Sequence, residues 1–277
     1  MKPIAALKAR IAFTALAGAA FLGLSAMALL PQSALAQTGA QVSTAPETTL
    51  NITYSVRARG ITAGEFSFRT TFNGDAYSVA ADRRMTGLVR AAVGASQDYS
   101  YSVRGTRAGT ILSPAAYRHQ GGRRNRLVQA AFSADDVVTT ATPEMGMGHP
   151  PATQAQRRGT IDQLTAMASL MLASGDPCAR TLRVYMDGRS RFDFAMSANG
   201  RQRVNIAGFR GEARRCSVQF RPIAGFSDPQ EAATLTFLVA PLPNGMYVPL
   251  RIEMPSDDNG IVTLEARSYQ VRGARPN

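Results

Sequence analysis

Few residues of this 277-residue sequence are of the types that catalyse reactions, and they are scattered. There are two histidines, His119 and His149, and neither lies near a cluster of acidic residues in the sequence. The Gly-x-Ser-x-Gly pattern that marks many serine hydrolases is missing. No cysteine and histidine spacing is typical of zinc, and no glycine-rich loop joins a strand to a helix to hold phosphate. We therefore predict a non-enzymatic protein with no catalytic residues and no cofactor.

Three candidate metal ligands lie close together, namely Met145, Met147 and His149. Two thioethers and an imidazole suit Cu(I), and the intervening glycines allow the three side chains to converge. The simpler interpretation is a loop that happens to contain two methionines. We adopt the simpler interpretation and predict no bound metal, with copper as the alternative.

Positive charge is the second chemical feature of the sequence. Lysine and arginine number 31 against 19 acidic residues, the formal net charge is +12, and every basic residue after Arg10 is an arginine. The planar guanidinium group binds phosphate and carboxylate through paired hydrogen bonds, so an arginine-rich surface is typical of anion binding. A coding bias towards arginine is the alternative explanation. The candidate anion-binding residues are Arg123, Arg124, Arg126, Arg214 and Arg215.

The first 36 residues have the parts of a secretory signal peptide: a basic start, an apolar run over residues 11–30, and a small-x-small cleavage pattern at Ala34-Leu35-Ala36. An uncleaved membrane anchor is the alternative, because the apolar run is long enough to span a bilayer. We expect cleavage and export to the periplasm, which makes nucleic acid an unexpected partner. No later stretch is comparably apolar, so the mature protein is not expected to be an integral membrane protein.

Two cysteines, Cys178 and Cys216, remain in the exported chain. An even number of cysteines in an oxidising compartment favours a disulfide. A loop of this length predicts a stabilisation of about 4 kcal/mol. The bond requires the two Cα atoms to lie within about 7 Å of each other.

The rest of the sequence predicts a β-rich protein. Residues 37–48 are polar and small and are interpreted as a flexible lead-in, followed by a single β-rich domain over residues 49–273. Apolar and polar residues alternate in many short segments, and the short connections favour antiparallel pairing. Pro249 indicates an edge strand or a bulge. The predicted fold class is mainly β, an antiparallel, strongly curved sheet or open barrel with one main α-helix packed against it.

Residues 182–194 predict a hairpin whose register the sequence leaves open. A two-residue turn would place apolar residues opposite charged ones, so the loop must contain an odd number of residues. Turn chemistry favours a loop of residues 186–188. Charge pairing favours a loop of residues 187–189, which places Arg183 opposite Asp193. In both registers the charged side chains are expected on the solvent-facing side.

The period of the apolar residues changes to that of a helix over residues 161–173. Thr160 and Gln163 have the spacing of a capping box, and Gly175 is placed to end the helix. We expect the helix to pack across the sheet. The helix face that would line a ligand pocket consists of Leu164, Ala168 and Met171.

Several stretches taken together resemble a bacterial family called domain of unknown function 3108. They are Tyr54-Ser55-Val56, residues 60–65, Thr86-Gly87-Leu88, residues 112–117, residues 162–166, residues 187–193, Cys216, and residues 248–252. The resemblance implies an envelope protein with a mostly antiparallel β-fold and no established activity. A broader likeness, at the level of the fold alone, is to open-barrel lipoprotein carriers, whose curved sheet encloses helices and an apolar cavity.

Two functions are consistent with these observations. The first is a periplasmic binding or carrier protein for a hydrophobic or lipid-like ligand, held between the sheet and the helix. The alternative is a cell-envelope interaction module that binds an anionic polymer or a partner protein through its arginine-rich surface. An open interior favours the carrier and a filled interior favours the module. The sequence does not indicate an oligomeric state.

The signal-peptide interpretation predicts that the exported protein begins at Gln37. Intact-mass measurement of protein purified from its own host checks this, and a retained N-terminal segment in exported protein would contradict it.

Overall fold

The structure is a computed structural model that describes residues 47–256 and 260–276. The predicted signal peptide (residues 1–36) and residues 37–46 of the predicted lead-in lie outside the described residues. The described elements form one sheet of thirteen antiparallel strands with three α-helices, so the predicted fold class is confirmed.

The first seven strands are β1 (Thr48–Ala58), β2 (Ile61–Asn73), β3 (Ala76–Met85), β4 (Tyr99–Ala108), β5 (Ile111–Gly121), β6 (Arg126–Phe132) and β7 (Val137–Thr142). The other six are β8 (Arg180–Met186), β9 (Ser190–Ile206), β10 (Phe209–Ala224), β11 (Ala233–Pro241), β12 (Tyr247–Ser256) and β13 (Gly260–Arg272). The helices are α1 (Gly87–Val93), α2 (Gln154–Arg157) and α3 (Gln163–Met171), with a short 3-10 helix η1 (Gly94–Gln97).

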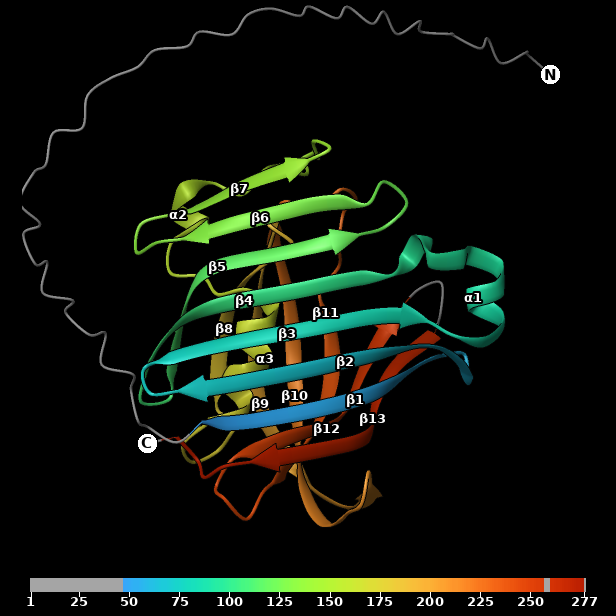
Figure 1. Cartoon of the computed structure of the whole chain (residues 1–277), viewed down its shortest axis with the longest axis vertical. Coiled ribbons are helices and arrows are strands. Elements are labelled where there is room, and N and C mark those ends of the chain that lie inside the picture. Colours follow the sequence, from blue (N-terminus) through green and yellow to red (C-terminus); the bar gives the residue numbers. More distant parts are fainter. Residues whose placement is uncertain (1–46, 257–259, 277) are drawn as a thin grey trace, which may run out of the picture. The chain divides into compact units, whose positions relative to one another are not determined.

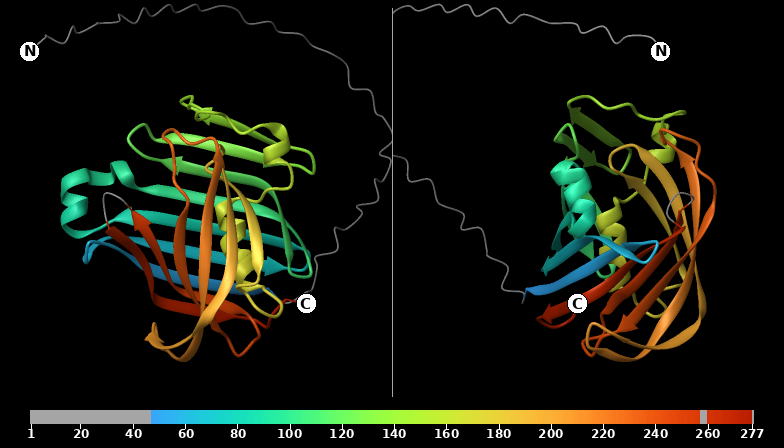
Figure 2. Two further views of the ribbon diagram at one scale, coloured as in Figure 1. Left: turned by 180° about the vertical axis from the view of Figure 1, so that it is seen from behind. Right: turned by 90° about the vertical axis from the view of Figure 1, so that its right-hand side faces the viewer.

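Two runs of strands join through the pairing of β1 with β13. The strand order is β7-β6-β5-β4-β3-β2-β1-β13-β12-β11-β10-β9-β8, and the edge strands β7 and β8 leave the sheet unclosed. The sheet curves so strongly that β1–β7 form one layer and β8–β13 a second layer behind it, with α3 between them (Figures 1 and 2). Short turns connect neighbouring strands, which explains the antiparallel pairing. Pro249 lies at a register shift between β11 and β12, as the bulge interpretation predicts.

Helix α3 is buried on nearly every side. Leu164, Ala168 and Met171 are at most 3% exposed and belong to the main core cluster, which includes apolar residues of β1–β5. On another side of the helix, Leu170 packs in the cluster formed by β9–β12. Ala166 contacts the apolar face of the β8–β9 hairpin. The helix thus fills the space between the two layers.

The predicted start of this helix is wrong by two residues. Asp162 is the N-cap, and one of its carboxylate oxygens accepts hydrogen bonds from the backbone N–H groups of Leu164 (2.9 Å) and Thr165 (3.0 Å). Ile161 is extended because its backbone pairs with β8, donating to the carbonyl of Arg183 and accepting from the N–H of Tyr185, both at 2.9 Å. A residue paired in this way cannot belong to a helix.

The β8–β9 hairpin has the register that charge pairing favours. Arg183 lies opposite Asp193, and residues 187–189 form the loop. The expectation that the charged side chains face solvent is wrong for Arg191, which is 3% exposed. Its guanidinium group donates to the carbonyl oxygen of Gln156 in α2 (2.9 Å) and to the Asp193 carboxylate (2.7 Å). Helix α2 therefore covers Arg191, whereas Arg183 on the same face of the hairpin is exposed.

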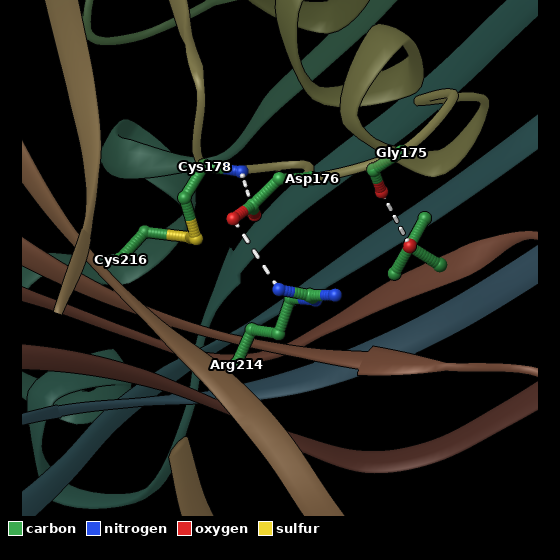
Figure 3. Close-up of a disulfide and its surroundings, with 6 residues drawn as sticks. Gly175, Asp176, Cys178, Arg214 and Cys216 are labelled. Carbon is green, nitrogen blue, oxygen red and sulfur yellow. Dashed lines mark hydrogen bonds and ion pairs between the residues drawn. A yellow bond between two sulfur atoms is a disulfide. The ribbon is translucent and has the colours of Figure 1, made fainter. Parts of the chain in front are cut away.

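The predicted disulfide between Cys178 and Cys216 is present, with a Cα–Cα distance of 5.2 Å (Figure 3). It connects the segment that follows α3 to strand β10. The carboxylate of Asp176 accepts a hydrogen bond from the N–H of Cys178 (3.0 Å) and pairs with Arg214 (3.3 Å). The exit of α3 is therefore fixed to the second layer by one covalent bond and one ion pair.

The fully buried carboxyl of Asp162 makes stability depend on pH. Burial raises its pKa to about 6, against the hydrogen bonds of Thr165 and Leu164, which lower it. The folded state then holds the proton more tightly than the unfolded chain, whose carboxyl has a pKa of about 3.9. The contribution of this group is fully present below about pH 4 and is lost as the pH rises through about 6.

Asp162→Asn keeps a capping oxygen but removes the titration. We expect the free energy of unfolding of the variant, relative to the natural chain, to rise by up to about 3 kcal/mol between pH 4 and 7. Urea unfolding of both proteins across this range measures the difference. A difference that stays constant with pH would contradict the assignment.

Candidate functional site

A basic cleft of about 500 Å³ opens between β4–β6 and the loop of the β8–β9 hairpin. Its arginines come from three separate places in the sequence, and they are Arg83, Arg123, Arg124, Arg126 and Arg189. Two tyrosines and one histidine, Tyr99, Tyr101 and His119, form its aromatic wall. We call this site the arginine cleft.

The β5–β6 turn presents two of these arginines to solvent. Arg123 and Arg124 are exposed and form no hydrogen bond or ion pair with any residue that the structure describes. The turn lies directly against Tyr99, and this close approach requires glycine. A Cβ atom on Gly121 would stand 2.2 Å from the carbonyl oxygen of Asp98, and one on Gly122 would stand 2.4 Å from the Tyr99 hydroxyl.

The other three arginines are fixed by neutral partners. Arg83 donates to the carbonyl oxygen of Gln97 (3.1 Å) and lies over the Tyr99 ring, 4.5 Å from its centre. Arg126 donates to the carbonyl of Pro143 (2.9 Å), and Arg189 donates to the hydroxyl of Ser227 (2.7 Å). Because carbonyl and hydroxyl oxygens carry no net charge, these bonds position the guanidinium groups without neutralising them.

Aromatic rings stack along the inner side of the cleft. The rings of Tyr99 and Tyr101 lie 6.0 Å apart and nearly parallel, and the His119 ring lies 5.8 Å from that of Tyr101. These residues alternate along β4 and β5, so their side chains emerge on the same face of the sheet.

A polar network beneath the cleft holds the hairpin loop to the first layer. The Tyr117 hydroxyl donates to the Asp187 carboxylate (2.9 Å) and accepts from the side-chain amide of Gln163 (2.6 Å), which also donates to Asp187 (2.7 Å). The Nδ1 atom of His119 lies 3.1 Å from the same hydroxyl. If Nδ1 carries the proton, the hydroxyl accepts two hydrogen bonds and donates one, so all of its capacity is used.

His119 is uncharged near neutral pH. Burial lowers its pKa below the usual value, Asp187 at 3.6 Å opposes that change, and Arg126 adds to it. The positive charge of the cleft therefore comes from the arginines alone.

A second pocket of about 590 Å³ adjoins the arginine cleft and shares Arg83, Tyr99 and Arg123 with it. It adds Arg84 and Arg90 to the basic surface. Together the two pockets are lined by seven arginines and three aspartates, Asp82, Asp98 and Asp187. The excess of positive charge suits this surface to binding anions.

The structure separates the predicted anion-binding residues into two groups. Arg123, Arg124 and Arg126 lie together in the arginine cleft. Arg214 and Arg215 lie on β10, where Arg214 pairs with Asp176 beside the disulfide (Figure 3). The two groups could not be told apart before the fold was known, because the charge of a residue does not show which surface it occupies.

The predicted ligand-pocket face of α3 contacts core residues. None of the five main pockets of the described residues is lined by a residue of α3. Its role in ligand binding stays a prediction. Of the candidate copper ligands, Met145 lines the arginine cleft, whereas Met147 and His149 line none of these five pockets.

Sequence reasoning missed most of the cleft. His119 had no acidic neighbour in the sequence, but Asp187 lies 3.6 Å from it in space. Tyr99 and Tyr101 were recognisable only as alternating strand residues. Within residues 47–256 and 260–276, no group of three or more histidine, cysteine, aspartate or glutamate residues is arranged to hold a metal ion.

Tyr117→Phe should destabilise the protein, because His119, Gln163 and Asp187 each lose a hydrogen bond to the buried hydroxyl. We expect a loss of about 1–3 kcal/mol in the free energy of unfolding, measured by urea titration. Tyr269→Phe is the matched control, since the half-buried Tyr269 forms no hydrogen bond with a described residue. Equal small losses of stability in the two variants would show that the hydrogen-bond network of Tyr117 does not contribute to the free energy of unfolding.

The comparisons with known proteins agree with the resemblance seen in the sequence. The described part of the chain contains no helix that is both long and apolar enough to cross a bilayer. No curated protein and no solved structure gives a significant match. The model of a family described as "Protein of unknown function (DUF3108)" matches residues 52–267, which is most of the chain. Three of the stretches that carry the resemblance supply Tyr117, Gln163 and Asp187 to the network under the cleft. The chain belongs to the DUF3108 family.

Proposed function

We propose that the protein is a non-enzymatic module of the cell envelope that binds an anionic component in the arginine cleft. The observation that carries this proposal is the convergence of five arginines around a stacked tyrosine pair at one end of strands β3–β6. Guanidinium groups supply bidentate hydrogen bonds to phosphate or carboxylate, and the aromatic rings supply flat apolar surface beside them.

The protonation and pairing of the cleft residues support anion binding. Arg123 and Arg124 have no described partner, so a ligand need not displace an existing ion pair to reach them. Asp187 is the one carboxylate that lines the cleft, and its oxygen already accepts hydrogen bonds from Tyr117 and Gln163. The local potential is therefore positive at neutral pH.

The interior supports the module over the lipid carrier. Helix α3 occupies the space between the two layers, where a carrier of the expected kind would hold its ligand, and its Ala168 and Met171 are fully buried by neighbouring side chains. Binding at the outer surface needs no opening of this core.

The proposal includes export and the absence of catalysis. Export rests on the signal-peptide pattern of residues 1–36. The non-enzymatic role rests on the cleft chemistry: its one histidine is buried and bonded within the network, and its arginines remain charged at all physiological pH values.

Binding of inorganic polyphosphate tests the proposal. Arg123→Gln combined with Arg124→Gln should weaken binding by about tenfold or more, since each charge-assisted hydrogen bond contributes on the order of 1.5–3 kcal/mol. Titration calorimetry measures the dissociation constants at low and high salt. Affinity should also fall as salt screens the arginines.

Arg203→Gln combined with Arg210→Gln is the matched control, because both residues are exposed on the β9–β10 side and the loss of charge is the same. This pair should leave the affinity nearly unchanged. Equal weakening by both pairs would show that only the net charge matters, and the cleft would then have no specific role.

A further inference from the structure

Helix α1 exposes apolar side chains that the core does not use. None of its residues is buried, although its sequence Gly-Leu-Val-Arg-Ala-Ala-Val is mostly apolar. Leu88 is 84% exposed. Ile61, at the start of β2, is 60% exposed.

These two side chains belong to the same end of the sheet. The N–H of Thr86, just before α1, donates to the carbonyl of Ala63 in β2 (3.1 Å), so α1 is joined directly to the segment that carries Ile61. Arg90 of α1 pairs with Asp98 (2.5 Å), which fixes the helix to the start of β4. Figure 1 and the left view of Figure 2 show α1 at this end, beyond the ends of the strands.

Arginines line a pocket next to α1, and Arg90 of this helix is one of them. The pocket beside α1 is lined by Arg84, Arg90 and Arg123, and it continues into the arginine cleft through Tyr99 and Gly122. Arg84 is exposed and forms no ion pair within the described residues. The same end of the sheet therefore carries protruding apolar side chains and an excess of positive charge, with four arginines and two aspartates in the pocket.

This combination fits the surface of an anionic bilayer. Apolar side chains of a short helix and a strand start can enter the region between headgroups and acyl chains, while arginines attract the phosphates around them. A protein partner is more often received in a groove or on a flat face of mixed polarity. Here the apolar residues protrude and the neighbouring charges are mainly of one sign.

We propose that the protein docks on an anionic lipid bilayer through this end, with Leu88 and Ile61 inserted and with Arg84 and Arg123 on lipid phosphates. The inference rests on the proposed function and deepens it, because it names the anion as a phospholipid headgroup in a membrane.

Tryptophan fluorescence tests the insertion directly, since the natural sequence contains no tryptophan. Leu88→Trp places the single fluorophore on α1. Ile111→Trp is the control, because Ile111 is 68% exposed but lies at the opposite end of the strands, at the β4–β5 turn. Both proteins are purified from their own host, so that they share the same N-terminus, and are mixed with vesicles of phosphatidylglycerol and phosphatidylcholine.

The expected result is a blue shift, and quenching by brominated lipid, for Leu88→Trp with vesicles that contain phosphatidylglycerol. Pure phosphatidylcholine should give a much smaller change, and Ile111→Trp should not respond to either vesicle. An unchanged spectrum for Leu88→Trp, or equal shifts for the two variants, overturns the inference.

A second pair of variants separates this inference from the function of the cleft. Ile61→Ser with Leu88→Ser should weaken vesicle binding by about tenfold or more and leave polyphosphate binding unchanged. Ile111→Ser with Val138→Ser, which removes two other exposed apolar side chains, should change neither. Full vesicle binding by the first pair overturns the docking proposal while the cleft proposal stands. A concentration-dependent shift of Leu88→Trp without lipid would indicate a second copy of the chain at this surface and also overturns it.

Discussion

Helix α3 is buried between two layers of one continuous sheet, and this packing holds the two layers together. A nine-residue helix is too short to be stable alone in water. Its apolar side chains meet the first layer on one side and the second layer on another, so each layer covers surface that the other leaves open. The Asp162 cap at one end and the disulfide after the other end fix the helix in this position.

The curvature imposed by this packing also creates the site. It carries the tip of the β8–β9 hairpin to β5, where Asp187 receives hydrogen bonds from Tyr117 and from Gln163 of α3. Arg189, on the same loop, then lies across the cleft from the β5–β6 turn. The same arrangement of the two layers therefore packs the core and assembles the arginine cleft from separate strands.

Because the interior is filled, we expect ligands to bind at the outer surface. Core side chains around α3 are closely packed, whereas arginines of the β5–β6 turn remain in water with no described partner. An exposed arginine keeps its hydration, so it costs the fold little stability and remains available to a ligand. Exposed leucine and isoleucine side chains lie at the same end of the sheet, and apolar groups clustered beside charge commonly mark an interaction surface.

Features that depend on near neighbours along the chain could be predicted from the residues alone. Alternation of apolar and polar residues identifies strands, because successive side chains of a strand point to opposite faces. The helical period over Leu164, Ala168 and Met171 identifies α3 for the same kind of local reason. The disulfide followed because only two cysteines are present to pair.

Features that depend on residues far apart in sequence became visible once the fold was known. The helix begins after Asp162, not at Thr160, because β8 pairs with Ile161. Arg191 is buried because α2 covers its side of the hairpin. The curved sheet brings distant strands together, and this places His119 beside Asp187 and groups the arginines of the cleft. A local pattern of residue types does not encode how the two layers face each other.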